Sequence, residues 1–170
     1  MPWEFTCLDW IQTHMRTSFG DSFFPIVTTL GDLGFIWILA GGALLFFGKQ
    51  RRNGIMILVG LAIGAIICNV ALKNIVARSR PCWINSDVVL LISMPSDYSF
   101  PSGHTLASVI GAILLTYADH RFALFAIPLA ILISFSRLYL YVHFPTDVLF
   151  SIFLGIIVST FTIWLFKKIR

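Results

Sequence analysis

Residues 54–72 read GIMILVGLAIGAIICNVAL, a stretch of nineteen residues in which Asn69 is the one strongly polar side chain. A helix of about 20 predominantly apolar residues is long enough to cross the hydrocarbon core of a bilayer. The whole chain has the same character, because 58% of its 170 residues are hydrophobic and 12% are charged. Soluble domains carry about 25% charged residues, so this composition predicts a membrane protein.

Four more apolar stretches share this pattern, at 23–47, 102–118, 122–136 and 148–166. Asp32 interrupts the first of them. Pro128 lies in the stretch 122–136 and is tolerated in a membrane, because neighbouring helices can satisfy the backbone groups that it frees. The two middle stretches are short, so they borrow flanking residues or cross a thin part of the bilayer. We predict an all-α fold, a polytopic transmembrane helix bundle of about five spans.

The N-terminal segment differs from these stretches because polar residues are spread through it. Apolar side chains recur there at helical spacing, at Trp3, Cys7, Trp10, Ile11, Met15 and Phe19. Much of the remaining surface is taken by Glu4, Asp9, Gln12 and Arg16. We therefore predict an amphipathic helix over 3–19 that lies at the membrane interface, with a partly ordered arm as the alternative. The chain then divides into an interfacial segment, 1–22, and a transmembrane domain, 23–170.

The charges between the spans are unevenly divided between the two membrane faces. One face carries a single acid, Asp119, and the basic residues Lys49, Arg51, Arg52, Arg121, Lys167, Lys168 and Arg170. Basic residues accumulate on the cytoplasmic side, so the connections 74–100 and 138–146 are predicted to be external. The net charge of +4 then relates to orientation and lipid head groups, and no basic stripe indicates a nucleic-acid partner. We predict a multi-pass protein of the cell membrane.

Polar residues gather at the ends of the second and third stretches. Lys73 ends the second stretch and Arg80 follows seven residues later; alone, either cation could be an interfacial anchor. The third stretch opens with Ser102, Gly103 and His104. The first turn of a helix has unpaired N–H groups that favour an anion, and a glycine there lets a ligand approach the backbone. Alone, this motif could be an ordinary serine N-cap followed by an unrelated histidine.

A third polar group surrounds the connection between the last two stretches. Arg137 follows the fourth stretch, and His143 and Asp147 stand on either side of Pro145. A carboxylate on one imidazole nitrogen fixes the tautomer and leaves the other nitrogen to attack, although Asp147 could also be a plain helix-terminal charge. The topology brings all three groups to the external face. Four helix ends that supply only phosphate-binding and acid–base residues indicate a phosphate site.

Taken in order, these groups resemble the three-part signature of the type 2 phosphatidic acid phosphatase (PAP2) superfamily. The matching residues are Lys73-x6-Arg80-Pro81, Pro101-Ser102-Gly103-His104 and Ser136-Arg137-x5-His143-x3-Asp147. The likeness extends from about residue 29 to residue 155. Larger members of the family usually have six spans, whereas in this chain the amphipathic segment takes the place of the first.

The resemblance implies a role for each motif residue. Phosphate oxygens would be held by Lys73, Arg80, Ser102, Gly103 and Arg137. His143, oriented by Asp147, would attack phosphorus and form a phosphohistidine, and His104 would protonate the leaving oxygen and then activate water. These cations would replace a metal ion, because phosphoryl transfer needs mainly positioning and charge stabilisation. We expect no metal or cofactor, because Asp147 is engaged and Asp87 and Asp97 stand apart.

Asp32 is a carboxylate inside an apolar stretch, and such residues are candidates for function. We expect it either to pair with Arg78 or Arg80 beside the site, or to lie at head-group depth. Both positions keep it on the external side, where the three polar groups gather.

The predicted reaction is metal-independent hydrolysis of a lipid phosphomonoester or diphosphate. Undecaprenyl diphosphate, phosphatidylglycerol phosphate and phosphatidic acid are the candidate lipids, and a soluble sugar phosphate such as glucose 6-phosphate is the alternative substrate. A vanadate haloperoxidase would use the same pocket, but the members of that branch are soluble. A catalytically silent lipid-binding protein would need the cations and not the acid–base pair of histidines.

Overall fold

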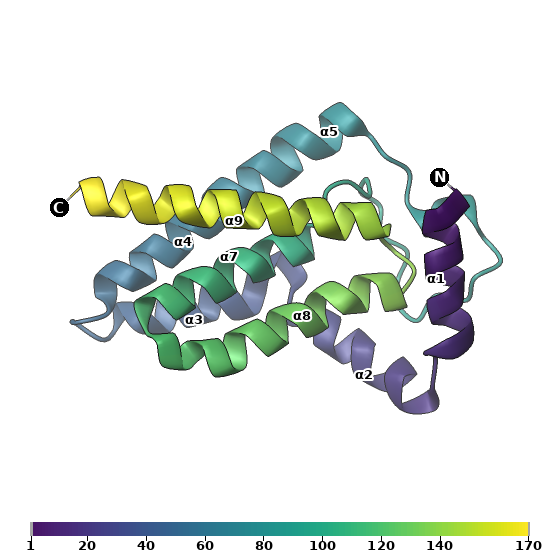
Figure 1. Cartoon of the computed structure of the whole chain (residues 1–170), viewed down its shortest axis with the longest axis horizontal. Helices are drawn as coiled ribbons and strands as arrows, with labels where there is room; N and C mark the ends of the chain where they lie inside the picture. Colours follow the sequence, from purple (N-terminus) through teal and green to yellow (C-terminus); the bar gives the residue numbers. More distant parts are fainter. Residues whose placement is uncertain (1, 170) are drawn as a thin grey trace.

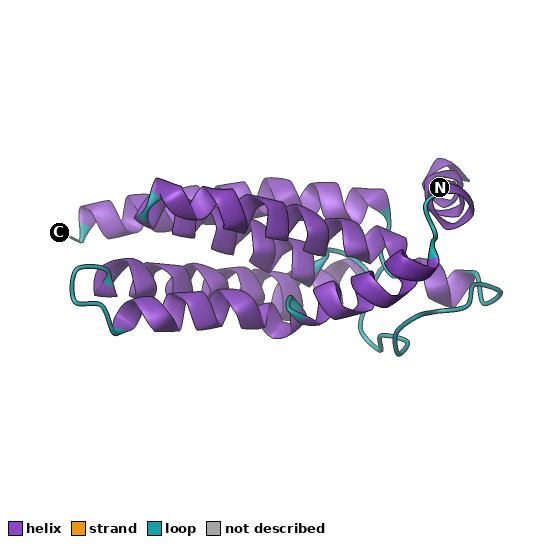
Figure 2. Ribbon diagram, turned by 90° about the horizontal axis from the view of Figure 1, so that it is seen from below, coloured by secondary structure: helices purple, strands orange, loops and turns teal. Residues whose placement is uncertain are grey.

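The structure, a computed structural model, describes residues 2–169. This part of the chain folds into an elongated bundle of helices (Figure 1). Most helices run along the long axis, and α1 lies across one end (Figure 1). In the view turned by 90°, α1 is seen nearly end-on (Figure 2). The segments are α1 Pro2–His14, α2 Ser18–Thr29, η1 Asp32–Gly34, α3 Phe35–Leu45, α4 Arg51–Ala65, η2 Ile66–Leu72, α5 Lys73–Val76, α6 Pro81–Ile84, α7 Gly103–Ala118, η3 His120–Phe122, α8 Ala123–Tyr139 and α9 Pro145–Lys168. Arg170, one of the predicted cytoplasmic cations, lies outside the described residues.

The apolar helices confirm the predicted all-α membrane bundle. Within residues 2–169, three segments are long and apolar enough to cross a membrane, Arg51–Ile84, His120–Tyr139 and Pro145–Lys168. A fourth candidate is the bent pair formed by α2 with η1 and α3. The remaining apolar stretch is α7, a helix of 16 residues that packs against α4, α8 and α9. Of the five predicted spans, three or four are thus candidates by length and composition, and the fifth corresponds to the shorter helix α7.

The first apolar stretch, predicted to span over 23–47 with an interruption at Asp32, is broken into two helices at that interruption. α2 ends at Thr29, and the chain bends by 46° before it continues as α3. Leu33 and Gly34 have φ values of +52° and +74°, which is the left-handed region. Glycine adopts that region without the steric cost that a Cβ brings, so the backbone at Gly34 can break the helix without strain. Asp32 consequently lies at a break between helices.

The helix of the second apolar stretch, predicted over 54–72, changes its type along its length. It begins as α4 at Arg51, before the predicted start, and is a regular α-helix as far as Ala65. Residues 66–72 then form the π-helical segment η2, which leads directly into α5. Such segments are rare and are frequent at functional sites. This one delivers Lys73 to the end of the span.

The N-terminal helix is shorter than the one predicted over 3–19. α1 ends at His14, and α2 begins after Thr17. The side-chain oxygen of Thr17 accepts a hydrogen bond from the Gly20 N–H at 3.0 Å. This N-cap satisfies a backbone donor that a helix start otherwise leaves unpaired, so a new helix begins there.

The faces of α1 also differ from the prediction. Leu8 and Ile11 are buried against the bundle, whereas Trp3 and Trp10 are 48% and 54% exposed. Glu4, which we expected on the polar surface, is completely buried. A helix that lies across the end of the bundle with outward tryptophans suits the membrane interface, and that location stays a prediction.

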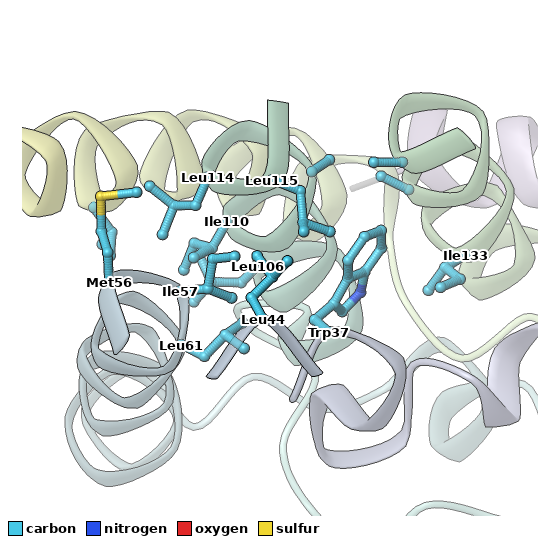
Figure 3. Close-up of a cluster of buried hydrophobic side chains, with 14 of the residues drawn as sticks. Trp37, Leu44, Met56, Ile57, Leu61, Leu106, Ile110, Leu114, Leu115 and Ile133 are labelled. Carbon is cyan, nitrogen blue, oxygen red and sulfur yellow. The ribbon is translucent and has the colours of Figure 1, made fainter. Parts of the chain in front are cut away.

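The main core lies between α3, α4, α7 and α8. The buried side chains of this core include Trp37, Ile57, Leu61, Leu106, Ile110, Leu114 and Ile133, and Figure 3 shows those of α4 and α7 grouped together, with Ile133 to one side. Trp37 is buried and donates its indole N–H to the Ser108 hydroxyl at 3.1 Å. Close packing on several sides holds α7 in place, so the residues at its N-terminus have a rigid support.

Candidate active site

A cavity of about 890 Å³ joins a charged end to an apolar groove. The charged end is lined by Lys73, Arg80, Gly103, His104, Arg137 and His143. Apolar side chains line the groove, namely Leu33 and Ile38 from η1 and α3, Leu58, Leu61, Ala62 and Ala65 from α4, and Leu106 and Ala107 from α7. Part of the connection between α6 and α7, residues 92–97, forms another wall. Six of the predicted site residues therefore meet in one cavity.

Three elements supply the cations of the charged end. Lys73 begins α5, Arg80 is the residue before α6, and Arg137 lies in the last turn of α8. All three are buried. Removing a cation from water costs several kcal/mol in a protein interior, unless partners compensate for the lost hydration. The site therefore has a strong preference for an anion.

Asp97 supplies an anion to two of these cations. One of its oxygens accepts a hydrogen bond from Arg80 Nη2 at 2.6 Å, and the other pairs with Lys73 Nζ. Partial burial raises the pKa of the Asp97 carboxyl, but the hydrogen bond from Lys73 and the charge of Arg80 outweigh it and hold the pKa well below its ordinary value. The expectation that Asp97 stands apart was wrong. Its carboxylate contacts two of the three cations that the sequence motifs predicted to bind phosphate.

Arg137 has fewer partners than Arg80. Its Nη1 donates a hydrogen bond to the hydroxyl of Thr28. Its Nε finds no hydrogen-bond partner among the described residues, although the atom is buried. A buried donor without a partner costs about 1–3 kcal/mol, and more when it is charged. Arg137 is thus a cation of the cavity whose charge is only partly compensated by hydrogen bonds.

His143 lies between a carboxylate and a guanidinium. Its Nδ1 is 3.6 Å from Asp147 Oδ2, and its Nε2 is 3.0 Å from Arg80 Nη1. The Ser99 hydroxyl, 3.4 Å from Nδ1, donates a hydrogen bond to the same Asp147 oxygen at 2.5 Å. That oxygen also accepts the Phe144 N–H at 2.8 Å. Asp147 and Ser99 thus hold the Nδ1 side of the ring, and Nε2 lies on the side of the phosphate-binding cations.

The surroundings of His143 favour its neutral form. This histidine lies in the loop between α8 and α9 and is completely buried. Burial lowers its pKa well below the ordinary value, and the positive charges of Arg80, Arg137 and Lys73 lower the pKa further. A neutral imidazole keeps a lone pair on one ring nitrogen, which a nucleophile requires, and in this structure the Nε2 lone pair accepts the hydrogen bond from Arg80.

His104 has a carboxylate partner of its own. Its Nε2 lies 2.8 Å from Asp32 Oδ1, so the expected pairing of Asp32 with Arg78 or Arg80 was wrong. The break between α2 and α3 turns Asp32 toward the start of α7. The ring fits closely over Gly31, where a Cβ would lie 2.8 Å from His104 Cδ2. Each imidazole of the cavity is thus oriented by a separate carboxylate.

Ser102 and Gly103 start α7 and have different surroundings. Ser102 is buried, and its hydroxyl oxygen accepts hydrogen bonds from the Thr105 N–H at 3.4 Å and from the Thr105 hydroxyl at 3.1 Å. Gly103 lines the cavity, and a Cβ there would lie 4.0 Å from Lys73 Nζ. Ser102 is not one of the described residues that line the cavity. In the structure it acts as the N-cap of α7.

Four side chains near the site had no signal in the sequence motifs. Asp97 and Ser99 come from the connection between α6 and α7, and Arg78 and Glu4 form a chain of hydrogen bonds behind Asp147. Their one common sign is a polar residue in a segment predicted to be external. That sign does not separate them from other loop residues.

Known proteins share both the motifs and the architecture. The family model described as the PAP2 superfamily matches residues 54–170, which is more than half of the chain. The chain belongs to the PAP2 superfamily. The matched part of this PAP2 protein contains every motif residue from Lys73 to Asp147.

Two curated relatives of the PAP2 chain are similar over most of its length. Undecaprenyl-diphosphatase from Sulfolobus acidocaldarius is 34% identical over 122 residues, which cover 71% of this chain and 59% of that protein. Phosphatidylglycerophosphatase B from Bacillus subtilis is 32% identical over 144 residues, which cover 77% and 68%. The chain thus spans about three fifths of the length of the first relative.

A solved structure shows the same arrangement of helices. It is the crystal structure of a transmembrane PAP2 type phosphatidylglycerolphosphate phosphatase from Bacillus subtilis. The TM-score is 0.73, the sequence identity is 24%, and the match covers 99% of this chain and 94% of that chain. The likeness confirms the predicted multi-pass membrane fold.

Proposed function

We propose that this PAP2 protein hydrolyses the phosphate or diphosphate ester of a lipid at the external face of the cell membrane. The cavity is the observation that carries this proposal, because its apolar groove leads to three buried cations and two histidines. The groove suits a hydrocarbon chain, and the charged end suits a phosphate. The names of the two curated relatives, which specify lipid substrates, support the same class of reaction.

Substrate binding exchanges one anion for another. The phosphate displaces the carboxylate of Asp97 from Lys73 and Arg80, and it lies beside the third buried cation, Arg137. Gly103, which starts α7 and lines the same end of the cavity, adds the favourable end of the helix dipole. The phosphate then lies beside Nε2 of His143.

The first chemical step transfers the phosphoryl group to the protein. Nε2 of His143 attacks phosphorus with its lone pair, and the bond from phosphorus to the lipid oxygen breaks. His104 gives a proton to that oxygen from Nδ1, while Asp32 holds the proton on Nε2 and favours the imidazolium. Asp147 stabilises the positive charge that develops on His143.

The second step releases inorganic phosphate. His104 is now neutral at Nδ1 and takes a proton from a water molecule. The oxygen of that water attacks phosphorus, and the electrons of the phosphorus–nitrogen bond return to His143. Both histidines regain their starting protonation states, so the cycle closes without a redox step or a metal ion.

The position of the site relative to the charged ends supports an external active site. The cations of the opposite end, such as Arg121, Lys167 and Lys168, lie near the C-terminal end of the bundle, and α1 lies at the other end (Figure 1). The positive-inside rule places the basic end in the cytoplasm. The cavity then receives its phosphate from the outer leaflet.

A substrate panel tests the proposal directly. Purified protein in detergent is given undecaprenyl diphosphate, phosphatidylglycerol phosphate, phosphatidic acid and glucose 6-phosphate, and released phosphate is measured with and without EDTA. We expect kcat/KM to be higher for at least one lipid than for the sugar phosphate, and EDTA to have no effect. A preference for glucose 6-phosphate would contradict the lipid assignment, and loss of activity with EDTA would contradict the metal-free mechanism.

A further inference from the structure

The N-terminal helix carries a buried acid that reaches toward the active site. Glu4 has no exposed surface, although Trp3 beside it is half exposed. Its Oε2 accepts a hydrogen bond from Arg78 Nη2 at 2.7 Å, and its Oε1 accepts one from the Thr146 hydroxyl at 2.5 Å. Carboxylates are almost never fully buried unless they are paired. The burial of Glu4 therefore depends on these contacts with the segments around the catalytic loop.

Arg78 joins this acid to Asp147. Its Nη1 donates hydrogen bonds to Asp147 Oδ1 at 2.6 Å and to the Thr146 hydroxyl oxygen at 2.7 Å, while Nη2 holds Glu4. The guanidinium also lies 4.1 Å from the centroid of the Phe144 ring. A planar guanidinium can bind two carboxylates in fixed directions, which the point charge of a lysine cannot do. Arg78 thus fixes the Asp147 oxygen that faces away from His143.

We propose that Glu4 and Arg78 are positioning residues for the nucleophile, acting on His143 through Asp147. In this arrangement α1 is a working part of the active site and not only an anchor at the membrane. Neither residue is among the described residues that line the cavity, so neither contacts the substrate. The inference rests on the proposed function, because it requires His143 to be the nucleophile.

The charges around the catalytic pair predict opposite effects for the two residues. The titratable and charged groups that face His143 and Asp147 are Lys73, Arg78, Arg80, Asp97, His104, Arg137 and, through Arg78, Glu4. Loss of the Arg78 charge removes a cation beside Asp147, so protonation of His143 becomes easier. Loss of the Glu4 charge leaves the Arg78 cation less compensated, so protonation of His143 becomes harder.

The test compares Arg78→Gln, Arg78→Lys and Glu4→Gln with the wild-type protein in one detergent and on one lipid phosphate. We expect Arg78→Gln to lower kcat about tenfold or more, with little change in KM, because the misplaced nucleophile affects the chemical step. The acidic limb of the kcat/KM profile should move to higher pH in Arg78→Gln and to lower pH in Glu4→Gln. Arg78→Lys, which keeps the charge and loses the bridging geometry, should fall between the wild type and Arg78→Gln in kcat.

Asp9→Asn is the matched control. Asp9 is an exposed acid of the same helix, and it accepts a hydrogen bond from the Tyr141 hydroxyl at 2.7 Å without touching Arg78. The same acid-to-amide change there should leave both kcat and the acidic limb at wild-type values. If Asp9→Asn reproduced the effects of Glu4→Gln, docking of α1 alone would explain them and the proposal would fail.

Other outcomes separate this inference from the proposed function. If the Arg78 and Glu4 variants melted at lower temperature and kept the wild-type acidic limb, the network would be structural and the inference would be overturned. Should Arg78→Gln not fold, Glu4→Gln and Arg78→Lys still decide the question. A wild-type protein that releases no phosphate, or a fully active His143→Ala variant, would overturn the proposed function itself.

Discussion

Two ion pairs of the same type, each between an arginine and an aspartate, lie at opposite ends of the molecule. Arg80 and Asp97 are joined at 2.6 Å in the cavity, and Arg121 and Asp119 are joined at 2.6 Å between α7 and α8. The side chain of Arg80 is 3% exposed, whereas that of Arg121 is 80% exposed. The two arginines therefore differ in hydration, since Arg80 is shielded from water and Arg121 is open to it, although the side chain of Asp97 is 51% exposed and that of Asp119 is 18% exposed.

This difference decides what each pair can do. An exposed pair is screened by salt and contributes little to stability, so the one role we expect for Arg121 is as part of the basic face that the positive-inside rule predicts to be cytoplasmic. The hydrogen bond from Arg121 lowers the pKa of Asp119 to about 2, and this shift indicates no binding or catalytic role for the pair. At the buried end, Arg80 has lost its hydration and binds whatever anion reaches it. Burial, and not residue type, distinguishes a binding site from an anchor.

The largest effect is expected when a histidine of the buried end and a histidine of the exposed end are each replaced by alanine. His143→Ala should lower kcat by about 10³-fold or more, because it removes the atom that accepts the phosphoryl group. His120→Ala is the control, since His120 is 92% exposed at the opposite end. It should retain the wild-type rate of phosphate release. Substantial activity in His143→Ala would show that another group attacks phosphorus.

The second effect concerns His104 and depends on the leaving group. His104→Ala should lower kcat about 10²- to 10⁴-fold with a lipid phosphate, whose alkoxide needs a proton as it leaves. The loss should be much smaller with p-nitrophenyl phosphate, because p-nitrophenolate leaves without protonation. Equal losses with both substrates would mean that His104 holds the substrate and does not act as the acid.

The sequence alone predicted the members of the buried end well. Lys73, Arg80, His104, Arg137 and His143 were expected at one face, and the structure brings all five to one cavity. The prediction worked because each residue stands at the end of an apolar stretch, and helices that cross a membrane bring alternate ends to the same side. Helix topology thus converts sequence spacing into proximity.

Other features depend on contacts that spacing does not encode. The pairing of Asp32 with His104 requires the left-handed backbone at Leu33, which the apolar pattern hides. Glu4 and Arg78 are 74 residues apart, in an interfacial helix and a loop with no shared periodicity. Asp97 lies in a long connection whose course only the folded chain reveals. Polar contacts made by loops were therefore missed, while those made by helix ends were predicted.

A smaller effect is expected when the two arginines are compared directly. Arg80→Lys should lower kcat/KM about 10- to 100-fold, because a lysine cannot reproduce the fork that contacts both His143 and the anion. Arg121→Lys makes the same change at the exposed end and should leave kcat/KM unchanged. Similar losses in both variants, measured on one lipid phosphate, would show that burial is not the property that matters.

The smallest expected effect comes from the two aspartates. Asp97 competes with phosphate for Lys73 and Arg80, so Asp97→Asn should lower KM, and the inhibition constant of inorganic phosphate, about three- to tenfold. The pKa of Asp97 lies well below its ordinary value, so the carboxylate stays charged at neutral and mildly acidic pH. The ratio of the wild-type KM to that of Asp97→Asn should accordingly be constant across that range. Asp119→Asn should leave both constants unchanged. A rise in KM for Asp97→Asn would mean that this carboxylate holds the cations in their binding geometry, so that the phosphate needs it in place and does not displace it.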